Sequence, residues 1–164
     1  MTTPASSPPN GPPNATVAPG DQGTVDAVQR ALAAEHAALW TLQLATAFVT
    51  DEVAPAVAEA TGAHRARRDA TELLLRDHGA VPVAAEPAYA TPAPVTDQAS
   101  AIALLTTAES DVAAAWRSAI EYTDDQAVRT LAVDSLTDAA VRATRWRRTA
   151  GTAPLTVPFP GAPG

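Results

Sequence analysis

The chain has 164 residues, of which 40 are Ala and none is Cys, and its formal net charge is −7 at pH 7. The lack of Cys excludes disulfides, thiolate metal sites and a Cys nucleophile. The acidic charge disfavours nucleic acid as a partner, because nucleic-acid binding depends on neutralising phosphates. The length and the Ala content favour a single all-α domain.

The sequence contains no uninterrupted run of about 18 apolar residues and no leader segment with an apolar centre. We therefore expect a cytoplasmic protein with no membrane partner. The first 22 residues are rich in Pro, Thr, Ser and Asn and have almost no large apolar side chain. Such a composition cannot bury enough surface to offset the entropy of ordering, so residues 1–22 are predicted to form a disordered Pro-rich tail.

Two helices are predicted in the first half of the chain. From about residue 24 to 50 the large apolar side chains recur at steps of three and four, at Val25, Val28, Leu32, Leu39, Leu42 and Val49. This spacing predicts a long amphipathic helix. A second helix is predicted from about residue 52 to 78, with Asp51 as its N-cap and Gly79 as its stop signal. The short connection between them indicates an antiparallel hairpin.

A Pro-rich segment at 80–96 separates the two halves, and its 17 residues span up to about 56 to 61 Å when extended. A third helix is predicted from about residue 97 to 122, capped by Thr96 or Asp97, and a fourth from about 124 to 149, ending at Gly151. The connections are short, long and short. This order predicts a ferritin-like four-helix bundle over 23–151, made of two antiparallel hairpins joined by a long crossover. Residues 152–164 are expected to form an irregular Pro-rich tail.

Acidic residues interrupt the apolar stripes of the first and third helices. Glu35 falls in the series 25, 28, 32, 35, 39, 42, and Glu109 falls in the series 102, 105, 109, 112, 116. Both carboxylates are therefore expected to face the interior of the bundle. A shift of 74 positions maps Glu35 onto Glu109, and it also maps the pair His64 and Arg68 onto the pair Asp138 and Arg142. These matches indicate an approximate internal two-fold.

An ionised carboxylate buried without a partner costs several kcal/mol, so the sequence must supply a partner, and two interpretations are open. In the first, Arg68 and Arg142 reach inward and neutralise the two glutamates. In the second, iron or manganese is bound by four donors, Glu35, His64, Glu109 and Asp138. Two-metal bundles use six ligands, including two Glu-x-x-His motifs, and Thr61 stands where the first such Glu belongs.

The first interpretation is favoured, with no catalytic residue, no metal ligand and no cofactor. The predicted interior polar network comprises Glu35, His64, Arg68, Glu109, Asp138 and Arg142.

Four stretches resemble an uncharacterised actinobacterial family of ferritin-like domains, a domain of unknown function. They are LAAEHAA at 32–38, AHRARRD at 63–69, YATPAPVTD at 89–97 and AAVRATRWR at 139–147. The resemblance extends over residues 25–161 and implies a ferritin-like fold. It marks Glu35, His64, Arg68, Glu109 and Arg142 as the interior polar set, and it implies no particular activity.

Three functions are compatible with these observations. The favoured one is a non-enzymatic interaction or assembly module with buried ion pairs, for which a homodimer is possible. Trp40 and Trp146 lie beside the predicted stripes and belong either to the rim of the core or to a dimer surface. The alternatives are a metal-dependent oxidoreductase using iron or manganese and a small-molecule pocket between the hairpins. All 11 basic residues are Arg. Two groups of them, at 65, 67, 68 and at 145, 147, 148, form either a basic patch for a phosphate or intramolecular ion pairs, and their acidic neighbours favour pairing.

Overall fold

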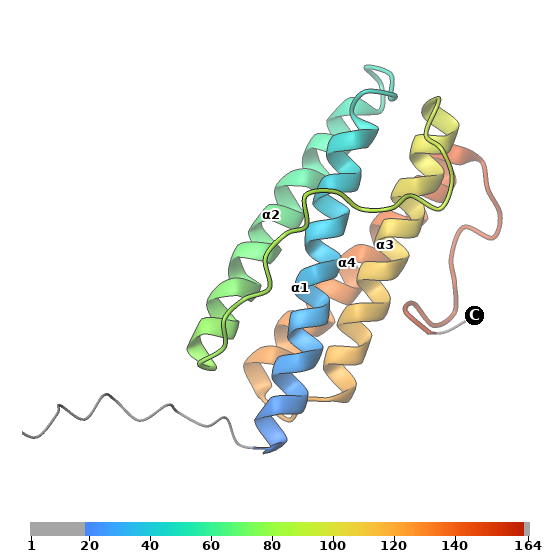
Figure 1. Ribbon diagram of the computed structural model, residues 1–164. Helices are drawn as coiled ribbons and strands as arrows, with labels where there is room; N and C mark the ends of the chain where they lie inside the picture. The colour runs from blue at the N-terminus through green and yellow to red at the C-terminus, as the bar shows by residue number, and fades with distance from the viewer. Residues whose placement is uncertain (1–18, 163–164) are drawn as a thin grey trace, which may run out of the picture.

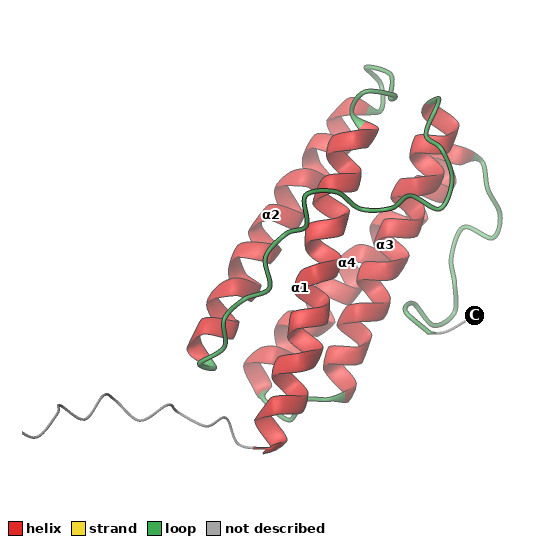
Figure 2. Ribbon diagram, in the orientation of Figure 1, coloured by secondary structure: helices red, strands yellow, loops and turns green. Residues whose placement is uncertain are grey.

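The computed structural model describes residues 19–162, in which it places four helices and no strand (Figure 2). The helices are α1 (Pro19–Ala45), α2 (Ala54–Asp77), α3 (Gln98–Glu121) and α4 (Gln126–Ala150). The expectation of an all-α protein is confirmed. None of these helices combines the length and the apolar character that a membrane crossing needs. Residues 19–22 of the predicted tail belong to α1, and 1–18 lie outside the described residues.

The C-terminal ends of α2 and α4 lie at the two predicted glycines. Gly79 and Gly151 adopt left-handed backbone conformations, with φ of 73° and 65°. After α2, the Gly79 N–H donates to the carbonyl of Arg76 and the Ala80 N–H donates to that of Leu75, both at 2.9 Å. These two bonds form a Schellman motif, which satisfies carbonyls that the helix itself leaves free.

The N-terminal ends of the helices agree less closely with the sequence predictions than the C-terminal ends do. Asp97 caps α3, because its carboxylate accepts a hydrogen bond from the Ser100 N–H at 2.8 Å in a capping box. The N-cap of α4 is Asp125, one residue beyond the predicted start of that helix at about residue 124. The predicted cap at Asp51 is wrong, because α2 starts later, after Val53, and has no side-chain cap.

The four helices form a bundle in which α1 packs against α2 and α3, and α3 packs against α4. The helices α2 and α4 contact each other only slightly. Alanines dominate the apolar cluster shared by α1, α3 and α4, where small side chains allow the helices to approach closely. Separate apolar clusters lie toward the two ends of α1, one containing Val28 and Leu32 and the other containing Leu42. Between these two clusters α1 places Glu35.

The connection from α2 to α3 runs lengthwise along the bundle and crosses α1 (Figure 1). Gln29 on α1 holds it twice, by donating to the Val81 carbonyl at 2.7 Å and by accepting from the Val83 N–H at 2.8 Å. Further along, the ring of Tyr89 lies 6.0 Å from that of Trp40, measured between centroids. The connection thus brings the chain back to the end of the molecule at which α2 begins, and α3 starts there (Figure 1).

Residues 151–162, the described part of the segment after α4, contain no helix or strand, and Gly161 in this segment lies close to α3. Gly161 has φ of 76°, and a Cβ atom there would lie 2.6 Å from the carbonyl oxygen of Ala113. Only glycine therefore allows this close approach. Leu155, Val157 and Phe159 in the same segment stay exposed.

Candidate functional site

The carboxylate of Glu35 lies at the centre of a buried polar network between α1, α2 and α3. Its side chain is fully buried and accepts hydrogen bonds from three different side chains. His64 Nδ1 lies 2.6 Å from Oε2, while Arg67 Nη1 at 3.1 Å and the indole N–H of Trp116 at 2.7 Å both donate to Oε1. Because every donor comes from a neighbouring helix, the carboxylate links α1 to α2 and to α3.

His64 lies between two carboxylates and faces one with each ring nitrogen. Its Nδ1 contacts Glu35, and its Nε2 lies 3.2 Å from Oε1 of Glu109. All three side chains are buried. An ionised carboxylate only accepts hydrogen bonds, and a neutral imidazole has a single N–H to donate. Two hydrogen bonds to two ionised carboxylates therefore require the doubly protonated imidazolium form of His64.

The electrostatics of the site favour this charged form. Burial lowers the pKa of His64, but its hydrogen bonds to Glu109 and Glu35, together with their negative charges, outweigh burial and raise the pKa above the ordinary value of 6.5. Burial likewise raises the pKa of Glu35, but the hydrogen bond from His64 and the charge of Arg67 outweigh it, so that the pKa lies below 4.5. Both shifts favour the charged pair, an imidazolium beside a carboxylate.

Arg67, not the predicted Arg68, is the arginine that reaches the interior. Its guanidinium is buried and joins Glu35 to Asp138, whose Oδ2 lies 3.3 Å from Nη2. The buried positions of α2 are Val57, Ala60, His64, Arg67, Thr71 and Leu75, at steps of three and four. Arg68 is one position off this stripe and instead donates to Asp69, at 2.9 and 2.7 Å. The spacing of these buried positions identifies Arg67 as an interior residue, whereas the 74-residue shift selects its neighbour Arg68.

On α4 the structure places Arg142 in the interior and Asp138 at the surface. The side chain of Asp138 is 60% exposed, so its predicted interior position is wrong. Arg142 is buried, but it does not reach either glutamate, and its Nη2 lies 3.6 Å from Oδ2 of Asp138 instead. The reason is again register, because the buried stripe of α4 passes through Ser135, Ala139 and Arg142 and leaves Asp138 at its edge.

With His64 protonated, the network is electrically balanced. Three carboxylates, those of Glu35, Glu109 and Asp138, face three cations, which are His64, Arg67 and Arg142. A neutral His64 would leave one uncompensated negative charge among buried groups, which is costly in a low dielectric. Three polar atoms of these groups stay outside the pairing, because Oε2 of Glu109 and both Nε and Nη1 of Arg142 are buried with no hydrogen-bond partner among the described residues.

The arrangement does not fit the four-ligand iron or manganese site considered from the sequence. Metal ligands must direct lone pairs toward one point, but the imidazole of His64 lies between the two glutamates and directs a nitrogen at each. Asp138, the fourth ligand in that hypothesis, is at the surface. Within residues 19–162, no group of three or more His, Asp or Glu is placed to hold a metal ion.

Fold and site together define an all-helical protein of four helices with buried salt bridges in its interior. The chain belongs to the family described as a domain of unknown function, DUF4439, whose model matches residues 27–164. It is similar to the crystal structure of a conserved hypothetical protein, rv2844, from Mycobacterium tuberculosis. The two are 34% identical, the match covers 78% of this chain and 97% of that chain, and the TM-score is 0.76. A comparison with curated proteins gives no match.

Proposed function

We propose that this protein is a non-enzymatic ferritin-like bundle that serves as an interaction or assembly module, with ion pairs in the place of a metal centre. The observation that carries the proposal is the position of His64 between Glu35 and Glu109, with one ring nitrogen on each carboxylate. Arg67 adds a second positive charge at Glu35. The protein's own side chains thus supply the positive charge that a metal ion would otherwise bring to these carboxylates.

The course of the chain supports the ferritin-like part of the proposal. The long connection 78–97 lets α2 and α3 start at the same end of the molecule (Figure 1). Two hairpins joined by one long crossover are the arrangement that ferritin-like folds use. The network then occupies the middle of the bundle, between the apolar clusters at the two ends of α1. Its role is to fix how α1, α2 and α3 align, because each ion pair forms in only one alignment.

The assembly we propose is a homodimer. Support comes from α4, where Val133 and Val141 lie two turns apart on one face and are each 45% exposed. Exposed apolar side chains that share a face are typical of a protein contact surface. Sedimentation velocity of the wild type is expected to show a dimer, and a Val133→Asp, Val141→Asp variant is expected to shift it to monomer. A wild type that stays monomeric at every concentration would contradict the homodimer.

Metal analysis tests the ion-paired interior. We expect the aerobically purified protein to carry no stoichiometric iron or manganese, and its melting temperature to stay unchanged when Fe(II) or Mn(II) is added. A ligand that binds only the native state raises the melting temperature, so a flat response is informative. The opposite result is one metal or more per chain that is lost in Glu35→Ala and Glu109→Ala but kept in Glu59→Ala, whose side chain is exposed. That result would favour the metal-dependent oxidoreductase instead.

A further inference from the structure

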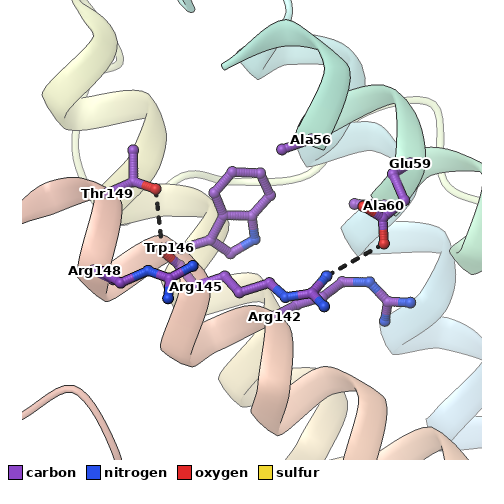
Figure 3. Close-up of a pocket in the computed structure, with 8 residues that line it drawn as sticks. All are labelled: Ala56, Glu59, Ala60, Arg142, Arg145, Trp146, Arg148 and Thr149. Carbon is purple, nitrogen blue, oxygen red and sulfur yellow. Dashed lines mark hydrogen bonds and ion pairs between the residues drawn. The ribbon is translucent and has the colours of Figure 1, made fainter. Parts of the chain in front are cut away.

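A pocket lies between α2 and α4, where these two helices barely touch (Figure 3). Its volume is about 150 Å³. That is several times the roughly 30 Å³ that one water molecule occupies in the liquid, so a small polyatomic ion has room. The lining residues come from α2, as Ala56, Glu59 and Ala60, and from α4, as Arg142, Arg145, Trp146, Arg148 and Thr149.

Two buried side chains of this pocket carry hydrogen-bond donors that have no partner among residues 19–162. They are Nε and Nη1 of Arg142 and the indole Nε1 of Trp146. The exposed fraction is 8% for Arg142 and 3% for Trp146. A buried donor without a partner costs free energy, and native proteins rarely leave one unless a bound water or ion satisfies it. These donors therefore point to a bound molecule that supplies acceptors.

The charge of the pocket specifies which kind of acceptor. Three arginines line it against a single carboxylate, that of Glu59, which lies 3.3 Å from Nη1 of Arg145. Arg142 and Arg148 are left without a carboxylate of the pocket, in a chain whose net charge is −7. Figure 3 shows the side chains of Arg142 and Arg145 extending from α4 toward α2, with the Trp146 indole beside them. The pocket is thus rich in donors and positive, which suits an oxyanion.

We propose that this pocket binds a phosphate group, either as inorganic phosphate or as the phosphate of a monoester. A phosphate presents acceptor oxygens in several directions and carries up to two charges, which matches guanidinium donors together with an indole N–H. The pocket shares Arg142 with the charged network, but it contains none of Glu35, His64 and Glu109, whose pairing carries the proposed function. Phosphate binding and a metal-free interior can therefore each fail without the other.

The indole N–H of Trp146 offers a direct test by NMR. The chain has three Trp residues, so a ¹H–¹⁵N spectrum contains three indole signals, which single Trp→Phe variants assign. Inorganic phosphate is added at constant ionic strength by replacing chloride. We expect the Trp146 signal to shift and saturate at one phosphate per chain. The Trp116 indole, which is already bound to Glu35 at 2.7 Å, is the internal control and stays in place.

A Trp146 signal that does not move, or that moves without saturation and equally in chloride, would overturn the proposal. Arg142→Gln is expected to weaken phosphate binding about tenfold or more, and Arg148→Gln, at a more exposed position, to weaken it by a smaller factor. The matched control is Arg76→Gln, which makes the same charge change about 25 Å further along α2 than Glu59.

Arg148→Gln keeps the variant test decisive if Arg142→Gln does not fold. Wild-type affinity in the Arg148→Gln protein, or an equal loss in Arg76→Gln, would also contradict the site. A parallel titration with phenyl phosphate distinguishes inorganic phosphate from a phosphate monoester as the ligand. Tighter binding of the ester assigns the pocket to a phosphorylated molecule, and tighter binding of the free ion assigns it to inorganic phosphate.

Discussion

Two regions of the bundle bury arginine, and they differ in what the guanidinium meets. In the network around Glu35, Arg67 donates to two carboxylates and lies beside a histidine that is itself paired at both nitrogens. In the pocket between α2 and α4, Arg142 has one ionic partner among the described residues, Asp138 at 3.6 Å, and two of its nitrogens have no acceptor there. In the first region the protein's own side chains pair the guanidinium, and in the second region part of the guanidinium lacks an acceptor.

The difference separates a structural role from a binding role. Disrupting a buried ion pair is destabilising, because removing either partner leaves the other charge desolvated and unpaired. An unpaired buried donor has already lost its hydration in the folded protein, so its removal costs little stability. Substitutions in the Glu35 network should therefore affect folding, and substitutions in the pocket should affect ligand binding.

The largest effect is expected for Glu35→Gln. The variant keeps the size of the side chain but leaves the charges of His64 and Arg67 facing a neutral amide, so the free energy of unfolding should fall by about 3–5 kcal/mol. Urea denaturation followed by circular dichroism measures this loss. Glu59→Gln, which breaks an exposed pair with Arg145, is the matched control and should change little. A comparable loss in both variants would remove the distinction between the two regions.

The next largest loss of unfolding free energy, about 2–4 kcal/mol, is expected for Arg67→Met, because Glu35 then keeps only His64 and Trp116 as donors. Arg68→Met removes the same charge one residue further on. Its guanidinium pairs with Asp69 near the surface, so the expected loss is about 1 kcal/mol or less. Equal effects of the two substitutions in the same denaturation experiment would show that Arg67 is not part of the network.

The pH dependence of stability is expected to show two arms. Because the pKa of Glu35 is lowered in the native state, its contribution is complete above about pH 4.5 and is lost as the pH falls through the native value. Because the pKa of His64 is raised, its contribution is complete below about pH 6.5 and is lost as the pH rises through the native value. Melting temperatures should therefore peak between these two values. In His64→Gln the alkaline arm should flatten, and an unchanged alkaline arm would contradict the assignment.

The smallest effect on stability is expected for Arg142→Met. Its ionic partner Asp138 is largely exposed, and its other nitrogens have no partner in the described part of the chain, so the free energy of unfolding should stay within about 1 kcal/mol of the wild type. The same variant should lose phosphate binding in the NMR titration. A large loss of stability in phosphate-free buffer would show that Arg142 supports the fold as Arg67 does, and would contradict its binding role.

Much of this organisation could be predicted from the sequence, because it depends on spacing. Steps of three and four placed Glu35 and Glu109 on apolar stripes, and both are buried. Glycines at the ends of periodic segments predicted where α2 and α4 stop, since only a residue without a Cβ atom adopts the left-handed conformation at no steric cost. The length of the segment 80–96 predicted a connection that returns along the bundle, and Figure 1 shows that course.

The partners within the network could not be predicted in the same way. A shift of one position along a helix turns a side chain by about 100°. Matching Arg68 to Arg142 by sequence offset therefore selected Arg68 instead of its neighbour Arg67, which is the residue that reaches the interior. Asp138 lies next to a buried position and yet faces solvent for the same reason. The unpaired donors of Arg142 and Trp146 depend on how far apart α2 and α4 lie, which is a tertiary property that no single helix pattern contains.

The protonation of His64 is the most direct test of the ion-paired interior. Its two ring nitrogens can be followed by ¹⁵N NMR in the purified protein from about pH 5 to 9, with His64→Gln used for assignment. We predict that both nitrogens carry protons at pH 6.5 and that deprotonation occurs above that value. A neutral ring with one protonated nitrogen at pH 6.5, or a ring proton displaced by added Fe(II) or Mn(II), would contradict the account.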